Sequence, residues 1–168
     1  MDGAIQLLAD GLVIPIVLIA VYALLRYVPK GERLRTYSYV VMAGLTAYLL
    51  AKLIGFVYQP AAQRPFELLG LEPGALYLNN PGFPSDHALF VAAIALAVWF
   101  ATRKKGLSIA LAVGVVLVCI ARVLALVHTP LDVIGGVAIA LVGGLWYIIG
   151  YNAVYKSRRS HHGKRNSS

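Results

Sequence analysis

Residues 84–102 read PSDHALFVAAIALAVWFAT, a short polar motif followed at once by an apolar run. We expect a helix to begin here with Ser85 as its N-cap. The first amide N–H groups of a helix have no intrahelical partners, so a helix start is a ready anion site. His87 at the start of such a helix therefore indicates phosphate chemistry.

The composition of the chain places this helix in a membrane. The 168 residues are 60% hydrophobic and 13% charged, with a mean hydropathy of +0.75, whereas a soluble domain carries roughly 25% charged residues. The net charge of +8 does not indicate nucleic acid, because the basic residues cluster at the ends of apolar runs. The sequence begins without a basic segment, so we expect no cleaved signal peptide. We expect one domain, integral to the membrane.

Five apolar segments approach or exceed the length needed to cross a hydrocarbon core of ~30 Å. They cover residues 4–27, 37–58, 85–102, 107–127 and 131–155. The sequence therefore predicts an all-α integral membrane bundle of about five transmembrane helices. The membrane domain would cover residues 1–155, followed by a basic, disordered cytoplasmic tail at 156–168. Residues 59–84 form the one long loop, with a short helix expected near residues 66–71.

The basic residues predict the orientation of the bundle. With five spans, twelve of the fifteen Lys and Arg residues fall on one side, which the positive-inside rule makes cytoplasmic. The N-terminus and the long loop then face outward, and the C-terminus is cytoplasmic. These twelve residues are Arg26, Lys30, Arg33, Arg35, Arg103, Lys104, Lys105, Lys156, Arg158, Arg159, Lys164 and Arg165.

The remaining cations fall near the outer side of the bundle. Lys52 and Arg122 each lie fifteen residues beyond the cytoplasmic start of their segments, about 22 Å along a helix. Charges inside apolar helices are costly, and they mark functional sites. We therefore expect a single outward-facing layer that contains Lys52, Arg64, Arg122, His87, His128 and Asp132.

The residue types in this layer fit phosphoryl transfer. Converging cations bind a multiply charged anion such as phosphate. One histidine can attack phosphorus to form a phosphohistidine, while the other protonates the departing oxygen and later activates water. Asp132 follows His128 by four residues, so it can orient that imidazole from the next helical turn.

At this point the residues resemble the three signature motifs of a known family. The motifs are Lys52…Arg64-Pro65, Pro84-Ser85-Asp86-His87 and Arg122-x5-His128-x3-Asp132. They are similar to those of the type 2 phosphatidic acid phosphatase superfamily, membrane lipid phosphatases related to vanadium haloperoxidases. The resemblance covers roughly half of the chain, and the third motif is the most specific.

The resemblance implies a role for each matching residue. His128 would be the nucleophile, Asp132 its orienting partner and His87 the acid for the leaving group. The phosphoryl oxygens would be bound by Lys52, Arg64, Arg122, Ser85 and the backbone N–H of Asp86. The family's mechanism needs no metal and no cofactor.

The sequence departs from the family pattern at three places. Eleven residues separate Lys52 from Arg64, more than the family motif has. Asp86 stands where glycine is common, and Ala121 where serine is common. A carboxylate at position 86 should repel phosphate unless a cation such as Arg64 neutralises it.

The Pro-Ser-Asp-His motif, the small size and the outward site are similar to those of bacitracin-resistance-type undecaprenyl pyrophosphate phosphatases. This branch implies hydrolysis of a polyprenyl pyrophosphate to the monophosphate and inorganic phosphate, at the extracytoplasmic face of the plasma membrane, in cell-wall biogenesis. The expected partners are the bilayer and a lipid phosphate, without nucleic acid. The oligomeric state is open.

Other interpretations remain open. The substrate could be phosphatidic acid or phosphatidylglycerol phosphate, or the protein could transport or bind an anionic lipid without hydrolysis. A metal-dependent hydrolase would use His87, His128, Asp86 and Asp132. Lys52 could instead be a snorkelling side chain. Asp10 could pair with a site cation, although exposure to solvent or the interface is the favoured interpretation.

Overall fold

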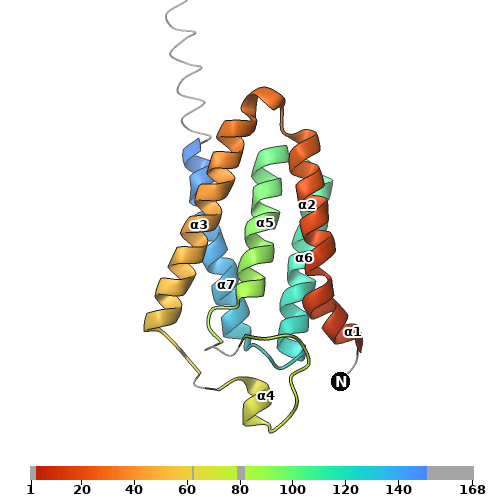
Figure 1. Cartoon of the computed structure of the whole chain (residues 1–168), viewed down its shortest axis with the longest axis vertical. Coiled ribbons are helices and arrows are strands. Elements are labelled where there is room, and N and C mark those ends of the chain that lie inside the picture. The colour runs from red at the N-terminus through yellow and green to blue at the C-terminus, as the bar shows by residue number, and fades with distance from the viewer. Residues whose placement is uncertain (1–2, 62, 79–81, 151–168) are drawn as a thin grey trace, which may run out of the picture.

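The computed structural model describes residues 3–61, 63–78 and 82–150, which are mostly helical and contain no strand. The long helices lie side by side, with α5 in the middle of the view (Figure 1). The elements are α1 (Gly3–Gln6), the π-helix η1 (Leu7–Gly11), α2 (Val13–Tyr27), the 3₁₀-helix η2 (Lys30–Glu32), α3 (Arg33–Val57), α4 (Pro65–Leu68), α5 (Asp86–Thr102), α6 (Lys105–Leu124) and α7 (Pro130–Gly143).

Four helical segments of the described chain are long and apolar enough to cross a membrane. They are Gly3–Tyr27, Lys30–Val57, Lys105–Leu124 and Pro130–Gly150. The fifth long helix, α5, is apolar but has only 17 residues. It nevertheless contacts α2, α3, α6 and α7. The predicted all-α membrane bundle is therefore confirmed, and α5, which is shorter than the four continuous segments that could span a membrane, contacts helices of all of them.

The surface and the interior of the bundle have the composition of a membrane protein. Large apolar side chains stay exposed on the outer helices, among them Leu18, Leu49 and Ile134, where lipid tails would cover them. The interior holds many alanines, including Ala47 on α3 and Ala92 on α5. Small residues let helix backbones approach closely, which drives association in lipid.

The observed helix bounds differ from the predicted ones in ways that shape the site. The second long helix begins at Arg33 rather than at residue 37, and the fourth ends at Leu124 rather than at residue 127. This early end is followed by Leu126 with a φ of 58°, a left-handed conformation that stops a helix. The short loop helix α4 covers Pro65–Leu68 instead of residues 66–71. Residues 151–155 of the last predicted span and the predicted tail at 156–168 lie outside the described residues.

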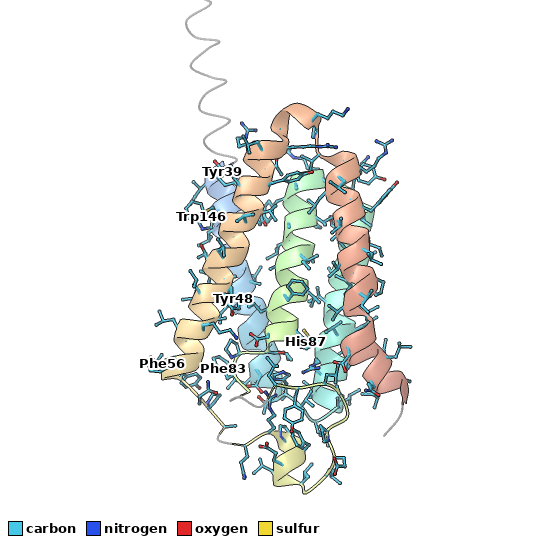
Figure 2. The ribbon with its side chains drawn as sticks, viewed as in Figure 1. Tyr39, Tyr48, Phe56, Phe83, His87 and Trp146 are labelled. Atoms are coloured by element: carbon cyan, nitrogen blue, oxygen red, sulfur yellow. The ribbon has the colours of Figure 1, made fainter. Side chains whose placement is uncertain are left out.

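The two ends of the bundle carry different groups. At one end, the basic connections meet, because Lys104 Nζ lies 4.8 Å from the centroid of the Tyr27 ring. His87 lies toward the other end, near the start of α5, in the same part of the view as Phe83 (Figure 2). The predicted site residues therefore gather at the end of the bundle away from these basic connections.

Candidate active site

His128 and Asp132 are fixed by the start of α7. Thr129 is the N-cap, and Pro130 takes the first helical position. Asp132 Oδ2 accepts a hydrogen bond from Thr129 N–H at 2.7 Å, and Asp132 N–H donates to Thr129 Oγ1 at 3.3 Å. This capping box holds the carboxylate 3.5 Å from His128 Nδ1. Because Nδ1 faces Asp132, Nε2 is the nitrogen left to attack an electrophile.

The surroundings of His128 keep its imidazole neutral. The side chain is 6% exposed, and burial lowers the pKa of His128 below its ordinary value of 6.5, although Asp132 opposes the shift. Burial disfavours the charged form of an imidazole. A neutral imidazole with a free ring nitrogen is the form that acts as a nucleophile.

Arg122 lies deep in the same end of the bundle. Its side chain is 1% exposed, and its NH1 group donates to Leu76 O and to Asp10 Oδ1, each at 2.8 Å. Its Nε–H has no hydrogen-bond partner among the described residues. A buried donor without a partner costs about 1–3 kcal/mol. An anionic oxygen would satisfy this donor, so the local chemistry fits phosphate.

Arg64 ties the long loop to the segment that carries His128. Its guanidinium donates to Val127 O and to Leu78 O at 3.1 Å. Residue Arg64 is 6% exposed. A Cβ atom placed on Gly82 would lie 3.3 Å from Asp132 Oδ2 and 3.8 Å from both Arg64 NH1 and His128 Nδ1. The backbone of Gly82 therefore lies close to the side chains of Arg64, His128 and Asp132.

Ser85 joins the second motif to the third. It is the predicted N-cap of α5, and its Oγ accepts from Ala88 N–H at 3.5 Å. Its own N–H donates to Asp132 O at 2.9 Å, and the residue is fully buried. The start of α5 is therefore anchored to the start of α7, which carries Asp132.

His87 belongs to the same site as His128. Its Nε2 lies 3.8 Å from Asp10 Oδ1. It also interacts electrostatically with Arg122 and His128. Its side chain is 34% exposed, more than that of His128. A partly exposed imidazole beside a buried one matches the division between a proton donor and a nucleophile.

The structure shows which cation contacts Asp86. Lys52 Nζ lies 2.9 Å and 3.0 Å from the two carboxylate oxygens of Asp86. The cation in direct contact with this carboxylate is therefore Lys52, and Arg64 interacts with Asp86 electrostatically. The long spacing between Lys52 and Arg64 does not remove Lys52 from this end of the bundle. Its ammonium group is held at the start of α5 by the Asp86 carboxylate.

Asp10 lies in the site, where the sequence did not predict it. The structure puts its side chain at 15% exposure against Arg122 and His87, whereas exposure to solvent or the interface was the favoured expectation. The available signal was position: Asp10 is the one charged residue between Ala4 and Leu25. An acid inside an apolar span is costly and needs a partner.

The geometry brings together two histidines, two buried arginines and two carboxylates. Such a site can bind a dianion, attack it with an imidazole and protonate a leaving group. The described residues contain no group of three His, Cys, Asp or Glu side chains that could hold a metal ion. In particular, the Asp86 carboxylate is paired with Lys52.

Comparison with known proteins identifies a matching family. The family model described as PAP2 superfamily matches residues 33–156. This range contains all the predicted site residues and excludes Asp10. No curated protein and no solved structure matches the chain.

Proposed function

The chain belongs to the PAP2 superfamily, whose members are phosphatases, and we propose that it hydrolyses a polyprenyl pyrophosphate through a phosphohistidine. The observation that supports this proposal is the His128–Asp132 pair, 3.5 Å apart. It lies in a buried site that also contains Arg122 and Arg64. The family match by itself indicates a phosphatase that acts on lipid phosphates.

In the first step, the lone pair of His128 Nε2 forms a bond to the terminal phosphorus. The bond from that phosphorus to the bridging oxygen breaks, and His87 gives a proton to the departing lipid monophosphate. Arg122 Nε–H and the Arg64 guanidinium stabilise the charge that gathers on the phosphoryl oxygens. Asp132 stabilises the positive charge on the phosphorylated imidazole.

In the second step, His87 takes a proton from water, and the water oxygen forms a bond to phosphorus. The bond between phosphorus and His128 Nε2 then breaks, which releases inorganic phosphate and restores both histidines. Each proton lost by His87 in the first step is regained in the second. The cycle therefore needs no further reactant.

A phosphate-release assay on the purified full chain in detergent tests the activity. The panel contains undecaprenyl pyrophosphate, phosphatidic acid and phosphatidylglycerol phosphate. We expect the pyrophosphate to be the best substrate. His128→Ala should lower kcat at least about a thousandfold while lipid binding persists, and His161→Ala, in the basic C-terminal segment, should retain full activity.

Trapping with ³²P-labelled substrate tests the intermediate. Wild-type protein should carry an acid-labile, alkali-stable phosphoryl group, as a phosphoramidate does, and His128→Ala should carry none. Lipid binding without phosphate release would favour a transporter or binding protein. Loss of activity with EDTA would favour the metal-dependent route, and preference for phosphatidic acid would replace the proposed substrate.

Membrane orientation has a separate test. We propose that the site end of the bundle is extracytoplasmic, because the basic connections mark the other end as cytoplasmic. In a Cys119→Ser background, Leu71→Cys, on the exposed outer loop, should react with an impermeant maleimide in intact cells. Lys30→Cys should react only after permeabilisation, and the reverse pattern would contradict the orientation.

A further inference from the structure

Asp10 connects two groups of the proposed mechanism. Its Oδ1 accepts from Arg122 NH1 at 2.8 Å and lies 3.8 Å from His87 Nε2. Its Oδ2 accepts from Leu76 N–H at 2.8 Å. One carboxylate therefore contacts a phosphate-binding arginine, the proton donor and the outer loop.

A local irregularity in the first helix places Asp10. The segment Leu7–Gly11 is a π-helix, in which Leu12 N–H donates to Leu7 O at 2.9 Å. Single π-helical turns occur frequently at functional sites. Ala9 is fully buried and packs with Ala121 and Ala125 at the end of α6. This packing holds the turn against the helix that carries Arg122.

Several charges act on His87 from the elements around it. They come from Arg122 on α6, Asp10 on η1, His128 before α7 and Asp86 on α5. Burial of His87 and the charge of Arg122 both oppose a positive charge on this imidazole, whereas the two carboxylates favour it. The Asp86 carboxylate is bound to Lys52 Nζ at 2.9 Å. Asp10 is therefore the carboxylate that offsets Arg122 next to His87 Nε2.

We propose that Asp10 is a positioning residue for the phosphatase reaction, and this inference rests on the function proposed above. It fixes Arg122 through NH1, which leaves Nε–H for a phosphoryl oxygen. It also stabilises the imidazolium of His87 before proton transfer to the leaving group. Asp10 lies in the N-terminal helical segment, outside residues 33–156 that match the family model.

Two substitutions separate the two effects. Asp10→Asn keeps an oxygen that can accept from Arg122 NH1 but removes the charge beside His87. Asp10→Ala removes both. Glu72→Gln is the control, because Glu72 is an exposed loop acid and its substitution changes the net charge by the same amount. The measurements are kcat/KM against pH, inhibition by inorganic phosphate, and Tm in detergent.

The alkaline limb of kcat/KM should report the loss of the proton from His87. Because Asp10→Asn removes the negative charge beside His87, we expect it to move this limb to lower pH by about one unit, with near-normal phosphate inhibition. Asp10→Ala should show the same shift and also about tenfold weaker phosphate inhibition. Glu72→Gln should give the wild-type profile. The position of a limb does not depend on the fraction of folded protein, so a purely structural loss would lower the rate without moving the limb.

Superimposable profiles for wild type and Asp10→Asn, together with unchanged phosphate inhibition in Asp10→Ala, would overturn the inference. An equal shift in Glu72→Gln would also overturn it, because the effect would then be one of net charge. In either case, phosphate release by the wild type would leave the proposed function standing. Failure of the wild type to release phosphate from any lipid would overturn the proposed function itself.

Discussion

Lys52 and Asp86 bind each other across the start of α5, with Lys52 Nζ 2.9 Å and 3.0 Å from the two carboxylate oxygens. Both residues belong to motifs that resemble phosphate-binding ones. In this structure the ammonium group is engaged by an internal carboxylate. A phosphate that uses Lys52 must therefore compete with Asp86 for it.

This competition can be measured with inorganic phosphate as an inhibitor. Asp86→Asn should release Lys52 and tighten phosphate inhibition about fivefold, since a half-exposed ion pair contributes up to about 1 kcal/mol. The control is Asp86→Asn in a Lys52→Met background, where the gain should vanish. An equal gain in both backgrounds would mean that Asp86 repels phosphate directly, without Lys52.

The acid limb of the pH profile should report His128. Burial lowers the pKa of His128 below 6.5, so the proposed nucleophile stays neutral at pH 7 and becomes protonated only at lower pH. We expect kcat/KM to hold down to about pH 6.5 and to fall below it. An acid limb that lies above pH 6.5 would contradict the role of burial.

The thermal stability of the protein should change with pH in the same direction as kcat/KM does on the acid limb. Below pH 6.5 the unfolded chain binds a proton at His128 before the folded chain does, so Tm should fall as the pH decreases. His128→Asn removes this titration and should flatten that part of the Tm curve. An unchanged slope in the variant would assign the pH dependence to other groups.

Gly82 should tolerate no large side chain, because a Cβ there would lie 3.3 Å from Asp132 Oδ2. Gly82→Val should displace the carboxylate from His128 and lower kcat at least about tenfold, since small misplacements near the chemistry are costly. Gly31→Val is the control, because a Cβ at Gly31 meets nothing within 4 Å. Equal kcat values for the two variants would remove Gly82 from the site.

Gly136 should be needed for the contact between α5 and α7. A Cβ at this position would lie 2.6 Å from Ser85 O and 3.0 Å from Leu89 N, so the two helices would have to separate. Gly136→Ala should lower stability by about 1–3 kcal/mol, measured as a fall in Tm. Gly44→Ala on α3 fills open space and should leave Tm nearly unchanged; a similar fall in both would point to a general effect of glycine.

The sequence predicted the helices well because the span of a membrane fixes their length and composition. The five apolar runs became five long helical segments, and Ser85 caps α5 as its position in PSDH indicates. Counting residues from the cytoplasmic ends also placed Lys52 and Arg122 at the site end, because a helix rises by a constant amount per residue.

The sequence could not predict which side chains would meet across helices. Asp10 contacts Arg122 because a π-helical turn and the alanines of η1 and α6 set the rotation of the first helix. No local pattern encodes that rotation. The Lys52–Asp86 pair depends in the same way on how α3 lies against α5, which is settled only by the packing of the whole bundle.

The shortness of α5 has a consequence for how a lipid reaches the catalytic groups. At ~1.5 Å per residue, a 17-residue helix is about 26 Å long, less than a hydrocarbon core of ~30 Å. With Arg103 and Lys104 held at one headgroup layer, His87 would sit a few ångströms below the opposite one. A lipid would then reach the site by lateral diffusion in its leaflet, with its phosphate displaced slightly toward the hydrocarbon core. It would not have to leave the bilayer. The turnover rate should accordingly depend on the acyl-chain length of the surrounding bilayer.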